Sequence, residues 1–202
     1  MIENILAAVT HFITQTISAL GYTGVVLLMA IESAAIPLPS EIIMPFAGFL
    51  ALAGRFNLLA LALAGAIGST FGSWVTYGLG FYGGRPLVRR FGRFVLLSEK
   101  DLDLTERFFQ RFGNASTFIG RLLPVVRTFI SIPAGIGKAP LLEFTIYSFL
   151  GSFIWSYLLA WVGFKLGEHW KDLEIYFRRF DTLILVLLLL ALAYAIKRHI
   201  KK

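Results

Sequence analysis

Long apolar stretches separated by short charged clusters dominate the pattern of this chain. Three stretches, 12–31, 57–82 and 144–164, are each long enough to cross a hydrocarbon core of roughly 30 Å as a helix. A fourth, 182–196, is shorter, so it spans only if residues 176–181 extend it and their arginines reach the interface. The start of the chain has no basic segment typical of a cleaved signal, so we keep it in the fold. The pattern predicts about four transmembrane helices.

Two further apolar segments contain residues that a straight, lipid-facing helix does not tolerate. Residues 34–54 hold three prolines and Glu41, and residues 115–137 hold two prolines, Arg121 and Arg127. Proline removes an amide donor, and a charge at the bilayer centre costs several kcal/mol. Broken backbone at membrane depth is tolerated only where protein or a water-filled cavity covers it. We therefore expect two re-entrant helical hairpins, each entering and leaving by one face.

These segments together predict an all-α, polytopic membrane protein with one transmembrane domain over residues 1–202. We also expect interfacial amphipathic helices at 98–111 and at 1–12. In chain order, the predicted parts are an amphipathic start and first span (1–31), the first hairpin (32–56), the second span (57–84), a cytoplasmic basic and amphipathic segment (85–114), the second hairpin (115–138), the third span (139–167), and a loop, fourth span and basic tail (168–202).

The distribution of lysine and arginine orients this layout. With the N-terminus in the cytoplasm, twelve of the basic residues that flank the spans and hairpins lie inside and four lie outside, which satisfies the positive-inside rule. Both termini are then cytoplasmic. The first hairpin enters from the outside and the second from the cytoplasm, so their tips approach each other near the midplane.

A weak internal repeat supports opposed hairpins. Gly68-Ser69 follows the first hairpin and Gly151-Ser152 follows the second, at an offset of 83 residues, and two later glycines recur at the same offset. Because glycine is common in transmembrane helices, coincidence remains an alternative. A real repeat here would have opposite topology in its two copies, and inverted repeats with broken helices meeting at the midplane are the architecture of secondary transporters.

Composition narrows the class of protein. Of the 202 residues, 57% are hydrophobic and only 15% are charged, with a mean hydropathy of +0.74, so a soluble globule is excluded in practice. The net charge of +7 is explained by orientation in a membrane, and we expect no nucleic-acid partner. The chain has no cysteine, and its three histidines are scattered. We expect no metal, no cofactor and no catalytic residue, and hence no enzyme.

Four ionisable residues in or beside the broken segments carry the functional prediction: Glu32, Glu41, Arg121 and Arg127. Prolines lie between the members of each pair, so a broken backbone could turn each pair toward one cavity. Two guanidiniums in a low-dielectric pocket suit a phosphate, because their planar forks match its oxygens. Carboxylates in a partly dehydrated cavity can load and release protons, which would couple anion movement to a proton gradient. The structural alternative is that acids and arginines merely neutralise each other.

Three hydroxyl residues could support this site. Ser40, Thr128 and Ser131 lie next to the charged positions. Their hydroxyls could donate to a phosphate, or they could cap backbone groups that the prolines leave free.

The residues also match a known family. The chain resembles the DedA family, also called the VTT or SNARE-associated Golgi domain family. The resemblance is carried by Glu32-Ser-Ala-Ala-Ile-Pro37-Leu-Pro39-Ser-Glu41 with Ala47-Gly48, then Phe112-Gly113, Gly120-Arg121-Leu-Leu-Pro124-Val-Val-Arg127 and Pro133-Ala134-Gly135.

The resemblance implies a bacterial or archaeal cytoplasmic-membrane protein that translocates lipids, with undecaprenyl phosphate recycling driven by the proton-motive force as the leading function. It also implies that the acidic pair of the first hairpin and the arginine pair of the second are essential, which maps onto Glu32, Glu41, Arg121 and Arg127 here. The second acid is often Asp in that family, so Glu41 is matched less closely than the arginines.

We therefore expect a flippase that moves a phosphate-headed polyprenyl lipid from the outer to the inner leaflet. Other hypotheses remain open: a phosphatidylethanolamine or general phospholipid flippase or scramblase, a proton-coupled antiporter for small cations, a membrane phosphatase, and a structural assembly factor. The partners expected are the lipid and protons, and the sequence leaves open whether the chain forms a homo-oligomer.

Overall fold

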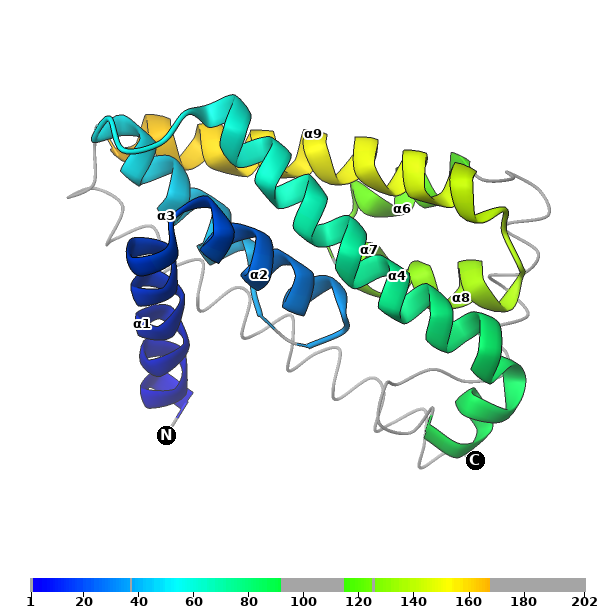
Figure 1. Cartoon of the computed structure of the whole chain (residues 1–202). Coiled ribbons are helices and arrows are strands. Elements are labelled where there is room, and N and C mark those ends of the chain that lie inside the picture. Colours follow the sequence, from blue (N-terminus) through cyan, green and yellow to red (C-terminus); the bar gives the residue numbers. More distant parts are fainter. Residues whose placement is uncertain (1, 37, 92–114, 125, 168–202) are drawn as a thin grey trace. The chain divides into compact units, whose positions relative to one another are not determined.

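The computed structural model describes residues 2–36, 38–91, 115–124 and 126–167, and this part is helical with no strand. The chain divides into two compact units, 1–165 and 166–202. The account below concerns the first unit and the end of its last helix. Its elements are α1 (Ile2–Leu20), α2 (Tyr22–Ser33), α3 (Ser40–Leu52), α4 (Leu58–Phe91), α6 (Ala115–Arg121), α7 (Val126–Phe129), α8 (Ser131–Ile136) and α9 (Leu141–Gly167) (Figure 1).

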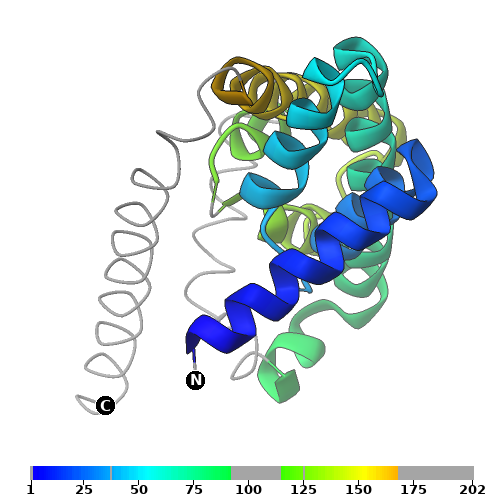
Figure 2. The same cartoon turned by 90° about the vertical axis from the view of Figure 1, so that its left-hand side faces the viewer.

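The first predicted span, 12–31, is wrong as a single helix. α1 ends at Leu20 and α2 begins at Tyr22, and Gly21 between them has φ 61° and ψ −134°. Only glycine adopts this backbone region readily, so the chain changes direction here, as Figures 1 and 2 show. α1 packs on the rest of the fold through Ile13 and Ile17, which are fully buried, whereas Phe12 and Leu20 are exposed.

The first hairpin consists of α2 and α3 joined by residues 34–39. The predicted segment 32–56 thus contains the end of α2, the connection and all of α3. α2 ends at Ser33 with Ala34 as its C-cap, and Ala35 takes a positive φ of 65°. At its other end α3 stops before Gly54, and the Arg55 amide donates to the Leu50 carbonyl.

The second hairpin is formed by three short helices, α6, α7 and α8. α6 ends at Arg121, and Pro124 lies in the turn that separates it from α7. α8 includes Pro133 and follows α7 after one residue. The broken backbone expected here from the prolines is present, within the range 115–138 that the sequence indicated.

Two long helices follow the hairpins. α4 and α9 are the helices of the described chain that are long and apolar enough to cross a membrane, over Leu58–Gly83 and Leu141–Gly167. They occupy the segments where the second and third spans were expected, although α4 continues to Phe91. Asn57 caps α4, its side-chain oxygen accepting from two amides of the first turn. The predicted fourth span at 176–196 and the amphipathic helix at 98–111 lie outside the described residues.

The glycines of the internal repeat sit at matching contacts. Gly68 of α4 approaches the backbone of α2 so closely that a Cβ would overlap the Val26 carbonyl, and Gly151 of α9 approaches α6, where a Cβ would lie 2.6 Å from Arg121 Cβ. Through these two glycines, each long helix packs on the first helix of the hairpin that precedes it in the chain.

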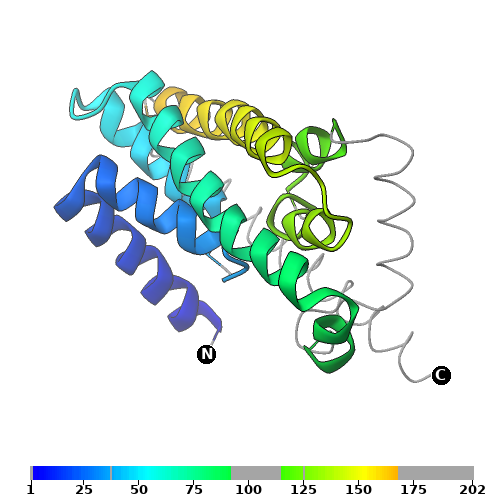
Figure 3. The same ribbon diagram turned by 45° about the vertical axis from the view of Figure 1, so that its right-hand side comes forward.

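The later glycines of the repeat cross over to the other hairpin. Gly80 of α4 lies against the Ile132 backbone of α8, and Gly163 of α9 lies against the Pro45 backbone of α3. Figure 3 shows α4 beside α8. The glycines of the sequence repeat therefore make a reciprocal set of close contacts, through which each long helix packs on both hairpins.

Candidate functional site

Arg127 links the two hairpins. It lies on α7, its side chain is 1% exposed, and its Nη2 is 3.1 Å from Glu32 Oε2 at the end of α2. Its Nη1 donates to Ser40 Oγ, at the start of α3, over 2.9 Å. The guanidinium also lies over the Trp155 ring of α9, 5.4 Å from its centroid. Arg127 therefore contacts both arms of the first hairpin and the last long helix.

The two acids of the first hairpin are connected to Arg127, Glu32 directly and Glu41 through the Ser40 hydroxyl. Glu32 is buried and accepts from Ser33 as well as from Arg127, through the same carboxylate oxygen. Ser40 accepts from Arg127 and donates to Glu41 Oε2 over 3.3 Å. Glu41, which is half-buried, thus reaches the arginine through one hydroxyl.

Arg121 is held differently, by hydroxyls alone among the described residues. It is fully buried at the end of α6. Its Nε donates to Ser148 of α9 over 3.0 Å, and its Nη2 donates to Ser131 of α8 over 2.7 Å and to Ser73 of α4. Its Nη1 has no hydrogen-bond partner in the described part of the chain.

The buried charges do not balance. Among the described residues, two arginines and one carboxylate, Glu32, are buried, and Arg121 experiences both the positive charge of Arg127 and the negative charge of Glu32. Removing ions from water costs several kcal/mol each, so an uncompensated buried guanidinium is a strong attractor for an anion. The arrangement is suited chemically to binding a phosphate or carboxylate group.

The four charged residues singled out by the sequence come together. Of the three supporting hydroxyl residues, two bond the arginines and one does not. Ser40 and Ser131 accept hydrogen bonds from the arginines, a role different from the expected donation to a ligand or to the backbone. Thr128 is half-buried on α7, and within the described residues it is not bonded to either arginine.

Three residues of the site were missed by the sequence analysis. Ser73, Ser148 and Trp155 contact the arginines from the two long helices. The only sequence signal for them was the repeated Gly-Ser pair, since Ser148 precedes Ser152 by four residues and Ser73 follows Ser69 by four.

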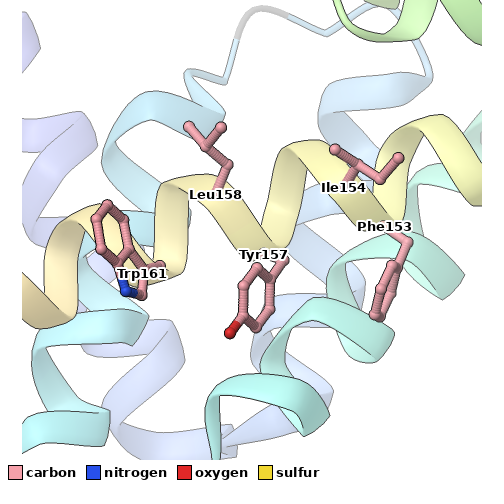
Figure 4. Close-up of a pocket in the computed structure, with 5 residues that line it drawn as sticks. All are labelled: Phe153, Ile154, Tyr157, Leu158 and Trp161. Atoms are coloured by element: carbon pink, nitrogen blue, oxygen red, sulfur yellow. The ribbon is translucent and has the colours of Figure 1, made fainter.

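The opposite side of α9 is apolar. An open groove is lined by five residues of this helix, and their side chains are drawn in Figure 4: Phe153, Ile154, Tyr157, Leu158 and Trp161. The same helix turns Ser148, Ser152 and Ser156 inward, where all three are buried. α9 therefore has one polar face in the interior and one apolar face outside.

Comparison with known proteins places the chain in a family. The VTT domain matches residues 38–165, a range that includes Glu41, Arg121 and Arg127 and begins after Glu32. Undecaprenyl phosphate transporter A of Bacillus subtilis is 35% identical over 182 residues, which cover 89% of this chain and 90% of that protein.

Of two further relatives, one carries the same name and one a different name. Undecaprenyl phosphate transporter A of Staphylococcus aureus is 30% identical and covers 95% of this chain and 97% of its own length. A protein of Lactococcus lactis called alkaline phosphatase-like is 31% identical over 95% of this chain and 92% of its own length. No solved structure matches the chain with significance.

Proposed function

The chain belongs to the VTT domain, or DedA, family of membrane proteins, and on that premise we propose that it transports a polyprenyl phosphate, most directly undecaprenyl phosphate, from the outer to the inner leaflet of a bacterial cytoplasmic membrane. The observation that carries the proposal is the pair of buried arginines, of which Arg121 has no carboxylate bonded to it among the described residues and a free Nη1. A lipid phosphate supplies the missing negative charge.

In this proposal the two arginines bind the phosphate in different ways. Arg121 offers its free Nη1 at once, because hydroxyls already orient the other nitrogens. Arg127 becomes available only when its bond to Glu32 opens. The phosphate and the Glu32 carboxylate therefore compete for one guanidinium.

This competition provides the proton coupling. When the phosphate displaces Glu32, the carboxylate loses its cationic partner in a buried place, where the charged form is disfavoured, and it takes up a proton. When the phosphate leaves, Arg127 binds Glu32 again and the proton departs. Glu41 is half-buried and is bonded to Arg127 through the buried Ser40 hydroxyl, and we assign these two residues as the proton's route.

The hairpins give the transport its two-sided access. We infer that they enter the membrane from opposite faces and that the reciprocal glycine contacts let the two halves exchange places around the arginines. The apolar tail stays in lipid, along faces such as the outward side of α9.

Reconstitution into vesicles tests the proposal. A short-chain polyprenyl phosphate is placed in both leaflets, and a membrane-impermeant phosphatase added outside measures how fast the inner pool becomes accessible. We expect R121Q and R127Q to slow transport roughly 10- to 150-fold, the value of a charged hydrogen bond of about 1.5–3 kcal/mol. R55Q is the matched control, because Arg55 is exposed and bonds only the Ser18 carbonyl among the described groups. Equal rates for all three variants and the wild type would refute the proposal.

The coupling is tested with E32Q in the same vesicles. Without the charge on Glu32, Arg127 is held less tightly and is more available to the phosphate, so we expect a lower half-saturating lipid concentration and a rate that no longer responds to an imposed pH gradient. A response equal to that of the wild type would contradict the role of Glu32.

The name of the Lactococcus relative motivates one alternative, a phosphate-releasing enzyme. Vesicles without added phosphatase distinguish the two, because a transporter leaves the lipid phosphate intact, whereas an enzyme releases inorganic phosphate.

A further inference from the structure

A line of hydroxyls runs along the facing sides of α4 and α9, starting at Arg121. Ser73 of α4 and Ser148 of α9 both bond this arginine. Ser69 and Ser152 lie one turn farther along their helices. One turn beyond them, Gly65 faces Ser156, since a Cβ on Gly65 would lie 2.6 Å from Ser156 Oγ. Residues four apart lie on one side of a helix, so the three levels form one continuous face.

Several groups on this face lack partners. The hydroxyls of Ser69, Ser152 and Ser156 are buried, at most 1% exposed, and have no hydrogen-bond partner in the described part of the chain. Arg121 Nη1 and Trp155 Nε1 are in the same condition. Hydroxyls in a helix can readily bond a carbonyl one turn earlier, as Thr70 does with Ala66 on α4. Three unpartnered hydroxyls beside the unpartnered Nη1 of Arg121 are therefore costly unless another group bonds them.

We propose that this face is a corridor for the phosphate group of the transported lipid, in which Ser69, Ser152 and Ser156 donate hydrogen bonds in succession as the group moves away from Arg121. The inference rests on the proposed function and adds the path of the headgroup to it. Ser148 and Ser156 are eight positions apart, which corresponds to about 12 Å along the helix, against a hydrocarbon core of roughly 30 Å.

The chemistry of the face favours an anion over a cation. Arginine and indole nitrogens can only donate, and each serine hydroxyl can turn its proton toward an acceptor. A phosphate has several acceptor oxygens, so it can accept from these donors and balance the positive charge of Arg121. At the level of Ser156 the helices are in close contact, because a Cβ on Gly65 would lie 2.6 Å from Ser156 Oγ and 3.2 Å from the Met44 sulfur of α3. In this proposal the headgroup therefore passes that level only when α4 and α9 move apart.

Paired serine variants separate a path from a binding site and from a structural role. We expect S152A/S156A to lower the maximal transport rate at least about tenfold, while the half-saturating lipid concentration changes less than about twofold. R121Q instead raises the half-saturating concentration. The thermal midpoint of the serine variant stays at or above that of the wild type, because the hydroxyls removed have no partner to lose.

T70V is the matched control, because it removes a buried hydroxyl of α4 that already has a partner. Its transport rate is expected to equal that of the wild type. If the wild type transports the lipid and S152A/S156A does so equally fast, the corridor is refuted and the proposed function stands. If the wild type does not transport the lipid at all, the proposed function itself fails.

Single cysteines give a second measurement, since the chain has none of its own. We expect S152C in vesicles to react with a small anionic thiosulfonate, and short-chain polyprenyl phosphate to slow the reaction. T70C is expected to stay unmodified. Equal reactivity at the two positions, or none at either, would overturn the corridor.

Discussion

Replacing Glu32 with alanine should destabilise the protein by about 3–5 kcal/mol, because it leaves the Arg127 guanidinium buried without its carboxylate. The lower end of this range is expected, since Arg127 keeps its bond to Ser40 and its contact with the Trp155 ring. E32Q retains an acceptor oxygen at the same place, so we expect a smaller loss, about 2 kcal/mol.

A double-mutant cycle isolates the contribution of the pair. R127A removes the buried charge together with its contacts, and E32A/R127A removes both charges, so the double variant should lose less than the sum of the single losses. We expect a coupling free energy of about 2–3 kcal/mol between the two positions. The measurement is equilibrium unfolding in mixed detergent micelles, followed by far-ultraviolet circular dichroism.

Two results would refute this reasoning. A coupling free energy below about 1 kcal/mol would place the pair among exposed ion pairs, contrary to its burial. The exposed K165Q serves as a control for loss of charge, and it should change the free energy of unfolding by no more than about 0.5 kcal/mol. A larger effect of K165Q would mean that the free energy of unfolding in micelles depends on net charge, and not on the Glu32–Arg127 pair.

Three further predictions concern the helices that carry the site, and thermal unfolding in detergent checks each of them. G68A should destabilise the protein by about 1–3 kcal/mol because its methyl group would overlap the Val26 backbone, whereas G78A on the same helix, with open space around it, should stabilise it by about 0.5–1 kcal/mol. N57A should cost about 1 kcal/mol through loss of the α4 cap, and N57D should restore it. Y77F should cost about 1–3 kcal/mol, because the Tyr77 hydroxyl donates over 2.6 Å to the buried Ala139 carbonyl; an unchanged midpoint would show that water takes over this bond.

Hydropathy and proline placement located most of the helices but not the first bend. The apolar runs that became α4 and α9 are long and free of proline over their central turns, so their length alone indicated helices that could span a membrane. Gly21 was missed because glycine is common within transmembrane helices, and hydropathy contains no information on its φ angle. The second hairpin was easier, since its prolines and arginines interrupt an apolar run at defined positions.

The charged residues of the site could be nominated from the sequence, but not their partners. An ionisable residue in an apolar segment is conspicuous, which singled out both arginines. Whether Arg121 meets an acid or a hydroxyl depends on which helices surround it, and Ser73 and Ser148 come from segments far away in the chain. Serine is tolerated almost anywhere in a membrane helix, so these two gave no signal of their own.

The reciprocal glycine contacts also bear on how the molecule moves. At Gly68, Gly80 and Gly163 the main chain rests on the main chain of a neighbouring element, and at Gly151 it rests on the first side-chain carbons of Arg121. Such a contact passes a displacement directly from one element to the next. A displacement of either long helix must then move both hairpins as well. The protein therefore moves as a coupled unit, and a displacement at the arginines is transmitted to both hairpins at once.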